Sequence, residues 1–567
     1  MIFVVCFTGV GAAQGRSDVA NAVMTGNTVA VRALIQKKAD VNAPQVDGAT
    51  ALHWAVHRDD LATADLLIRA GAGIDVANRH GTTPLAMASL YGNTAMVKRL
   101  LEAGADAKRP GPNGETAVML AARNGNPDII ALLAAAGADV NAKEKIRGTT
   151  ALMWAAEQKH PLAVKALLDR GADVAARSGP AGLPRNYMAN YVNTSAVEAA
   201  AQRRLAAAAA GRTYQEQLAL ERKQGTVPPG PVPALGAAAA AAAPAAAPAP
   251  AAAQPADDDD DIIVAGLVGS GGGGLTALVF ASREGDLASA KLLLDAGADI
   301  NQTTEYGWTP LLTAVNNRNY AVAAHLIERG ANVNLANKGG WTPLYLATDN
   351  RNIEGGDYPV PKPDLDHLEI ITRLLERGAN PNIRVKDNTL TRTIFTMQWF
   401  FEAGATPLIR AAQSGDTELL RLLLKHGADP KLVTDLGDSA LTVAGGIGWV
   451  EGVTYERSPQ DNLETIRLLL DLGLDPNYAN NEGRTPLMGA ALKGRNDVVR
   501  LLVERGARLD TRDRGSRDTD KIGSQAAGHR WQAIDYAEGL VRVGVQSAIP
   551  HPGTAALLRQ LMIDRGL

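Results

Sequence analysis

The sequence predicts an all-α fold, a solenoid of stacked helix–turn–helix repeats, and two observations lead to this prediction. The string Gly-x-Thr-Pro-Leu recurs along most of the chain, with Leu-Leu-x-x-Gly-Ala-Asp later in each copy. The anchor threonines Thr50, Thr83, Thr116 and Thr150 are 33, 33 and 34 residues apart. A fixed period of this length is typical of units that bury their apolar faces only when they stack on one another.

The copy at residues 81–113 shows why these residues recur. Thr83 can cap a helix with its hydroxyl group, and Pro84 follows at the first helical position, where a backbone N–H would have no partner. Gly92 turns the chain into a second helix, whose apolar residues recur at helical spacing. Gly104 suits the left-handed conformation that ends a helix. We therefore predict two helices per copy, followed by an exposed turn.

These strings closely resemble the ankyrin repeat. The resemblance is carried by residues 81–85 with 100–106, and again by residues 307–311 with 326–332. It implies a solenoid of about 11–12 repeats with short, β-hairpin-like tips between them. It also implies that the turns and the first helix of each repeat form a concave groove that binds other proteins.

The pattern divides the chain into two arrays and one long interruption. Residues 17–178 hold repeats 1–5, and residues 275–515 hold repeats 6–11. Between them, residues 179–274 contain a possible helix and then tracts rich in Ala, Pro, Asp and Gly, so we expect this insert to be largely disordered. Residues 516–567 are predicted to form C-terminal capping helices.

The seam at the insert predicts that the two arrays stack directly. Removing the insert would join the fifth repeat to the sixth as a normal boundary between repeats. The second helix of the fifth repeat keeps apolar residues such as Leu167 instead of a polar capping face. We therefore expect the helix of Leu167 to pack against the helix of Leu292 in the sixth repeat.

Three shorter insertions interrupt the second array, at residues 353–364, 383–403 and 445–460. The middle one holds an aromatic run that includes Trp399, and the last one holds Trp449. Such a cluster is either a small satellite core under a long loop or an exposed anchor for a partner. The sequence is compatible with both interpretations, a satellite core and an exposed anchor.

The N-terminus suggests export. Residues 1–13 form an apolar run that ends Gly-Ala-Ala and looks like the remnant of a signal peptide, although a basic n-region is missing. We predict a periplasmic or secreted bacterial protein, or a cytoplasmic one if the run is not a signal peptide. The only cysteine, Cys6, lies in this run, so the mature chain would have no thiol chemistry. No apolar stretch is long enough to predict a membrane span.

Several strings imitate functional motifs without their context. The glycines at 269–274 match a dinucleotide-binding fingerprint, but the helix that follows is in repeat register and no βαβ unit surrounds it. His57-Arg58-Asp59 imitates a kinase triplet with no downstream Asp-Phe-Gly. The run Asp257–Asp261 is contiguous, whereas calcium needs spaced ligands. We therefore predict no enzyme, no cofactor and no metal.

Histidine and charge give further expectations. His53 stands where ankyrin repeats commonly carry a structural histidine that links neighbouring turns by hydrogen bonds, and the nine histidines show no metal-ligand spacing. The net charge of -3 lacks the basic excess of a nucleic-acid binder.

Variable positions on the turns and near the ends of the first helices are the predicted partner contacts. Trp308 and Trp341 are one repeat apart and either form adjacent aromatic steps or pack on the neighbouring turn. The full set is His57, Arg58, Arg79, Tyr91, Arg123, Glu157, Arg283, Tyr306, Trp308, Arg318, Trp341, Trp399 and Trp449.

The predicted function is that of a monomeric, non-catalytic scaffold that binds a protein partner in the groove. The alternatives are an enzyme, or an enzyme-associated module, with its site in the insertions, and a purely structural spacer. The sequence does not name the partner, because one repeat fold serves unrelated ligands.

Overall fold

The computed structural model describes residues 17–179, 273–352, 362–386, 403–449, 456–515, 530–543, 546–547 and 549–567, with a few single positions between 206 and 223. The chain divides into two compact units. Unit 1 comprises Met1–Gly179 with Thr276–Asp299, and unit 2 comprises Pro180–Leu275 with Ile300–Leu567. Trp399 and residues 1–13 lie outside the described residues.

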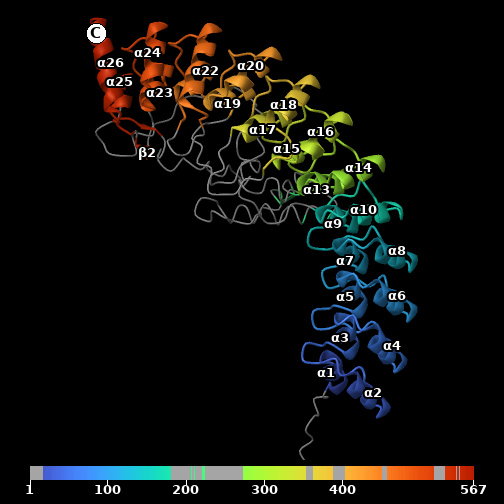
Figure 1. Ribbon diagram of the computed structural model, residues 1–567. Helices are drawn as coiled ribbons and strands as arrows, with labels where there is room; N and C mark the ends of the chain where they lie inside the picture. The colour runs from blue at the N-terminus through green and yellow to red at the C-terminus, as the bar shows by residue number, and fades with distance from the viewer. Residues whose placement is uncertain are drawn as a thin grey trace, which may run out of the picture. The chain divides into compact units, whose positions relative to one another are not determined.

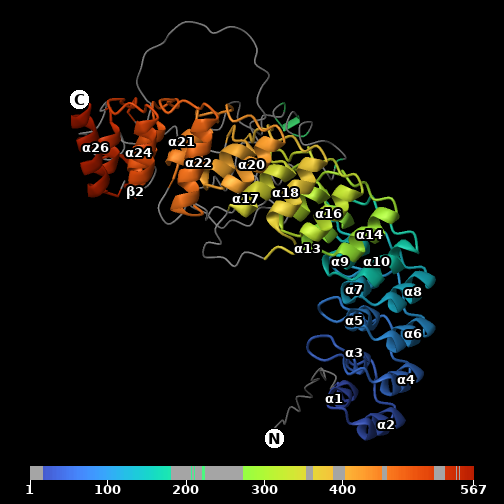
Figure 2. The same ribbon diagram turned by 45° about the horizontal axis from the view of Figure 1, so that its top comes forward.

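Unit 1 is built from two parallel rows of short helices (Figures 1 and 2). Each first helix packs on the next first helix and on the second helix of its own repeat. The first-helix row is α1 (Asp18–Met24), α3 (Ala51–His57), α5 (Pro84–Tyr91), α7 (Ala117–Asn124), α9 (Ala151–Glu157) and α13 (Ala277–Glu284). The second-helix row is α2 (Thr28–Gln36), α4 (Leu61–Arg69), α6 (Thr94–Glu102), α8 (Pro127–Ala135), α10 (Pro161–Leu168) and α14 (Leu287–Asp295).

Unit 2 repeats the same two-row arrangement. Its first helices are α15 (Pro310–Asn316), α17 (Pro343–Arg351), α19 (Pro407–Gln413), α21 (Ala440–Gly445) and α23 (Pro486–Leu492). Its second helices are α16 (Tyr320–Glu328), α18 (His367–Glu376), α20 (Thr417–Lys425), α22 (Pro459–Asp471) and α24 (Asn496–Glu504).

The end of unit 2 departs from the repeat. Helix α25 (Ala533–Ala537) packs on α23, and α26 (Pro552–Asp564) packs on α24. Between them, β1 (Arg542–Val543) pairs antiparallel with β2 (Gln546–Ser547). Apart from this ribbon and one isolated bridge, the regular structure of the described residues is helical, which confirms the predicted all-α class.

Threonine caps start the first helices, as the repeated string predicts. The hydroxyl of Thr83 accepts a hydrogen bond from the backbone N–H of Ala86 at 3.2 Å, and Pro84 occupies the first turn. At the other end, Gly92 adopts the left-handed conformation with φ 77°. A side chain would be strained there, so glycine is the residue that lets the chain reverse. The caps of the other repeats use the same contact, at Thr116, Thr150, Thr276, Thr309, Thr342, Thr406, Ser439 and Thr485.

The turns between repeats form a ladder of backbone hydrogen bonds. Arg79 donates its N–H to the carbonyl of Asp47 at 2.9 Å, and Lys145 donates to Asn113 at 2.7 Å. The intervening turn carries Pro112 at the donor position. Proline has no N–H, so this step of the ladder is missing among the described bonds.

Asparagine side chains that follow the second helices of several repeats form a second ladder. Asn382 donates its side-chain amide to the carbonyl of Gly427 at 2.9 Å and accepts from the N–H of Asp429 at 2.8 Å. Asn42, Asn141, Asn334 and Asn477 make the same pair of contacts with the following repeat. Each of these residues therefore satisfies two backbone groups of its neighbour.

The fifth and sixth repeats stack directly within unit 1. Helix α9 packs on α13, and α10 packs on α14. Glu157 and Arg283, 126 residues apart in sequence, form an ion pair of 2.9 Å across this seam. This is the arrangement expected from the apolar residues around Leu167.

Replacing Asn382 by alanine removes one donor and one acceptor and leaves two backbone groups of the next repeat with water as their only partner. We expect the free energy of unfolding to fall by about 1–2 kcal/mol, measured by urea denaturation followed by circular dichroism. The exposed Lys425→Ala variant on α20 is the control and should change it by less than about 0.5 kcal/mol. Equal losses in the two variants would contradict the role of the asparagine ladder.

Candidate functional site

His53 is a structural residue, as predicted. It is 1% exposed, and its Nδ1 accepts a hydrogen bond from the backbone N–H of Thr50 at 3.1 Å. Its Nε2 lies 3.0 Å from the carbonyl of Thr82 in the next turn and must therefore carry the proton that it donates. Burial lowers the pKa of His53 below its usual value. The neutral ring thus links two repeats and offers no free nitrogen to a ligand.

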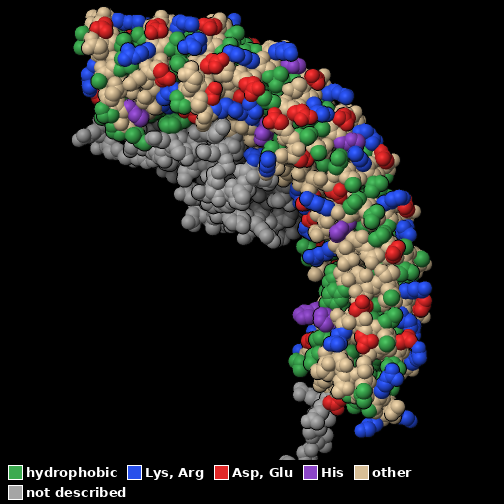
Figure 3. All heavy atoms as spheres, in the orientation of Figure 1, with side chains coloured by type: hydrophobic (Ala, Val, Ile, Leu, Met, Phe, Trp, Pro, Cys, Tyr) green, Lys and Arg blue, Asp and Glu red, His purple; other side chains and the backbone are tan. Residues whose placement is uncertain are grey.

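Five predicted contact residues of unit 1 are exposed together. They lie on what we call the front surface, formed by the turns at 44–48, 78–81, 111–115 and 144–148 and the C-terminal ends of α3, α5, α7 and α9. Histidine side chains stand out at the edge of unit 1 beside α3 (Figure 3). The exposed residues are His57, Arg58, Arg79, Tyr91 and Arg123.

Aromatic side chains are paired on the front surface. The ring of Tyr91, which is 44% exposed, meets the ring of His57 edge-on with centroids 5.7 Å apart. His57 meets Trp54 in the same way at 5.5 Å. The side chains are therefore held in place before any partner arrives, which lowers the entropy cost of binding.

A shallow hollow of about 670 Å³ lies at the N-terminal end of the front surface. Gln45 fixes its wall by accepting from the indole N–H of Trp54 at 2.6 Å and donating to Asn21 at 2.6 Å. Arg79 and His80 line the other side. The remaining lining residues are Ser17, Val46 and Asp47.

Two predicted contact residues of unit 1 are occupied within the fold. Glu157 and Arg283 pair with each other across the seam described above, and both side chains are mostly buried. They stabilise the stack, and the sequence alone could not distinguish this role from partner binding.

The aromatic residues predicted in unit 2 are buried instead of exposed. Trp341 is 0% exposed and meets Tyr345 edge-on with centroids 4.8 Å apart, while Trp308 and Tyr306 are each 4% exposed. The ammonium group of Lys338, on the next turn, lies 6.0 Å from the Tyr306 ring. The interpretation as adjacent aromatic steps is therefore wrong, and packing within the stack is correct.

The other predicted residues of unit 2 are only partly accessible. Arg318 is half-buried with a positive φ of 61°, and Trp449 is half-buried with the ammonium of Lys493 5.3 Å from its ring. All residues of α19, α21 and α23 are buried. Trp399 lies outside the described residues. Among the described residues, the predicted contact positions that are exposed all lie in unit 1.

A buried ion network in unit 2 was missed by the sequence analysis. Arg410 on α19 has a side chain only 2% exposed and donates to Asp349 on α17 at 2.7 Å. Its other nitrogens donate to Gln413, to Ser414 and to the carbonyl of Asn352. A signal did exist, because most other repeats carry an apolar residue, such as Trp54, four positions after the capping residue.

The network continues at the start of α20. Asp416 accepts from the N–H of Leu419 as the helix cap, and also from Arg351 at 2.8 Å and Arg457 at 3.1 Å. Each carboxylate thus has an arginine partner. The arrangement ties α17, α19 and α20 together and leaves neither carboxylate as a free base.

Tyr320 and His367 form a second buried polar contact. Burial raises the pKa of Tyr320, so its hydroxyl stays protonated, and this hydroxyl forms a hydrogen bond of 2.8 Å with Nδ1 of His367. Burial, with help from the charges of Arg318 and Arg351, lowers the pKa of His367 to about 4. His367 is therefore neutral at neutral pH.

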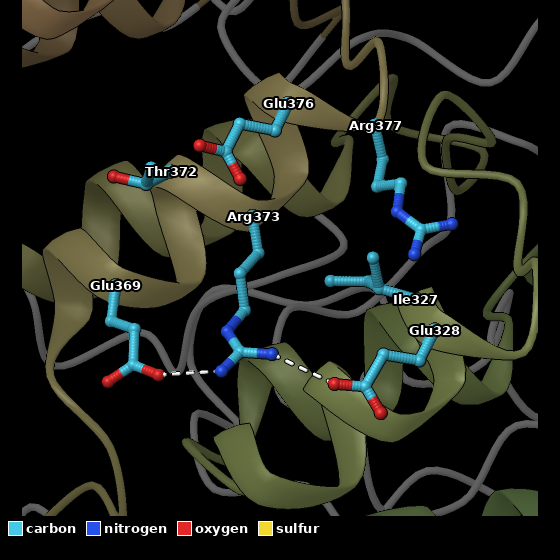
Figure 4. A pocket seen from close by; sticks show the side chains of 7 residues that line it. All are labelled: Ile327, Glu328, Glu369, Thr372, Arg373, Glu376 and Arg377. Atoms are coloured by element: carbon cyan, nitrogen blue, oxygen red, sulfur yellow. Dashed lines mark hydrogen bonds and ion pairs between the residues drawn. The ribbon is translucent and has the colours of Figure 1, made fainter.

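A second hollow, of about 450 Å³, lies on the second-helix side of unit 2 between α16 and α18 (Figure 4). Arg373 bridges Glu328 and Glu369 there, at 2.9 Å each. Arg373 thus engages both carboxylates, and the remaining lining residues are Ile327, Thr372, Glu376 and Arg377.

In the described part of the chain, no group of three or more His, Cys, Asp or Glu side chains is placed to hold a metal ion. Within the same residues, no helix is both long and apolar enough to cross a bilayer.

Comparison with known families identifies the repeats. A family model for ankyrin repeats (3 copies) matches residues 19–110, 105–178, 278–385 and 458–513. A model for a single ankyrin repeat matches residues 403–435. These matches together cover more than half of the chain.

Known relatives match short parts of the chain. Ankyrin repeat, SAM and basic leucine zipper domain-containing protein 1 of Dasypus novemcinctus is 36% identical over 107 residues, which are 19% of this chain and 21% of that protein. Ankyrin repeat and SOCS box protein 16 of Mus musculus is 34% identical over 106 residues, which are 19% and 22%.

A putative ankyrin repeat protein of Fowlpox virus (strain NVSL) is 27% identical over 148 residues, which are 20% of this chain and 31% of that protein. The chain thus spans between 21% and 31% of the length of these relatives. They come from mammals and a virus, so they do not support the predicted bacterial type.

Replacing Arg410 by methionine leaves Asp349 buried without its main partner. We expect the free energy of unfolding to fall by about 3–5 kcal/mol, measured by urea denaturation. The double variant Arg410→Met/Asp349→Leu should recover most of this loss, because both charges are then removed from the interior. A single variant no less stable than the double variant would contradict the proposed pairing.

Unit 2 should lose stability in acid because of His367. Between its usual pKa of 6.5 and its folded value of about 4, the unfolded chain binds a proton that the folded chain excludes. Stability therefore falls as the pH drops through this window, by about 1–2 kcal/mol for a partly exposed group.

Thermal denaturation at pH 7 and pH 4.5 tests this expectation. The difference in melting temperature between the two pH values should be smaller for His367→Gln than for the unaltered chain. His80→Gln, which changes an exposed histidine on a turn, is the matched control. An unchanged pH dependence in His367→Gln would contradict the assignment.

Proposed function

The chain belongs to the ankyrin repeat family, and from this premise we propose that it is a non-catalytic scaffold that binds a protein partner on the front surface of unit 1. Ankyrin repeats are generally protein–protein interaction modules, and the family is generally non-enzymatic. The observation that carries the proposal is the exposure of His57, Arg58, Arg79, Tyr91 and Arg123 on the first-helix ends and a turn of three successive repeats.

The composition of this surface supports the proposal. Tyrosine and arginine are enriched among the residues that dominate binding energy at protein interfaces. Tyr91 offers a large ring already held by His57, and arginines stand on either side of it along the stack. In unit 2 the corresponding first helices are buried, which favours unit 1 as the binding region.

The relatives are consistent with a recognition role. Their names combine ankyrin repeats with a SAM and basic leucine zipper domain in one case and a SOCS box in another. In these two proteins the ankyrin repeats are combined with different additional domains. This is expected of a module that contributes binding instead of catalysis. Export from a bacterial cell and a monomeric state stay predictions from the sequence.

A capture experiment tests the proposal. The full chain is immobilised and exposed to extract from its native source, beside the variant His57→Ala/Tyr91→Ala/Arg123→Ala, with folding checked by circular dichroism. We expect the variant to bind the recovered partner at least tenfold more weakly, because it removes central aromatic and arginine contacts. Trp308 and Trp341 are unsuitable targets, because their burial means that alanine would disturb the fold.

The control variant carries Arg32→Ala, Lys98→Ala and Leu162→Ala on the second-helix row, all exposed. It should bind as the unaltered chain does. Equal partner affinity of the front-surface variant and this control would reject the front surface as the binding site.

A further inference from the structure

Four cationic side chains stand on the front surface of unit 1. They are Arg58, Arg79, Arg123 and Lys145, and all are exposed. Within the described residues, Arg58 makes one long hydrogen bond of 3.4 Å to the carbonyl of Met24, and none of the four pairs with a carboxylate. Their charge is therefore available to a partner.

Most carboxylates of the same surface are already engaged. Glu144 is 5% exposed and accepts from three backbone N–H groups of its own turn. Glu157 pairs with an arginine across the seam, and Glu115 accepts from a backbone N–H at 3.0 Å. Asp47 and Asp59 remain exposed. Cations thus exceed exposed carboxylates on this surface, although the whole chain carries a net charge of -3.

The cations follow the repeat spacing. Arg58 and Arg123 are two repeats apart along the helix ends, and Arg79 and Lys145 are two repeats apart along the turns. Two repeats correspond to about 20 Å, because packed helices lie 8–10 Å apart. An extended chain of about six residues spans this distance. Tyr91 belongs to the repeat between those of Arg58 and Arg123, so its ring offers an apolar contact between the two arginines.

We propose that the front surface of unit 1 binds an acidic, extended segment of a partner protein, at least six residues long. This inference rests on the proposed function, whose partner class it names. Carboxylates of the segment pair with Arg58, Arg79, Arg123 and Lys145, and an apolar residue between them packs on Tyr91. Charge complementarity of this kind sets specificity and association rate, and it weakens with salt.

Binding of a defined probe to the full chain tests the proposal. The probe is a fluorescein-labelled peptide of nine aspartates, and its counterpart has nine asparagines; fluorescence anisotropy measures affinity. The variant is Arg58→Gln/Arg79→Gln/Lys145→Gln. The control Arg32→Gln/Lys98→Gln/Lys108→Gln makes the same change in net charge at exposed sites away from the front surface.

The unaltered chain and the control should bind the aspartate peptide at least tenfold more tightly than the asparagine peptide. The front-surface variant should lose at least tenfold in affinity for the aspartate peptide, and raising NaCl from 0.05 to 0.3 M should weaken binding several-fold. Equal loss in the control would overturn the proposal, because net charge alone would then explain binding.

Two further outcomes are informative. One distinguishes failure of this inference from failure of the proposed function, and the other distinguishes a separate partner from a segment of the chain itself. A chain that captures its partner on the front surface but does not prefer the aspartate peptide overturns this inference and leaves the proposed function intact. If the chain binds the peptide only after Asp257–Asp261 are changed to asparagine, its own acidic run competes with the peptide for the front surface. That result overturns the proposal of a separate partner.

Discussion

The structure depends on one constraint: a pair of short helices cannot bury its own apolar face. Helices of six to thirteen residues, such as α21 and α22, are too short to be stable alone in water, so each repeat needs its neighbours. The packing of α10 on α14 shows how strict this requirement is, since the stack continues although residues 169–286 separate the two helices in sequence.

Polar contacts give the stack its register. Apolar packing tolerates sliding, whereas the threonine caps, the turn ladder and the asparagine ladder fix each repeat on the next through directional hydrogen bonds. His53 and Asn382 each link one repeat to the next in this way. The Arg410–Asp349 pair adds a charged version inside unit 2, where losing one partner costs more than losing both.

The two units use their first helices differently. In unit 1 the helix ends and turns carry exposed His57, Tyr91 and arginines, while in unit 2 α19, α21 and α23 are buried throughout. A surface that is exposed, preorganised and unevenly charged can discriminate between partners. The same repeat frame therefore leaves helix ends and turns exposed in unit 1 and buries three first helices in unit 2.

The sequence by itself determined the repeat, the helix caps, the structural role of His53 and the all-α class, because these depend on residues close together in one period. Five of the seven contact residues that it predicted in unit 1 are exposed in the structure. Only the tertiary structure decided that Trp308 and Trp341 are buried, that Glu157 pairs with Arg283 and that Arg410 has a buried partner. Burial and pairing are set by contacts between residues distant in sequence, which a repeat pattern does not record.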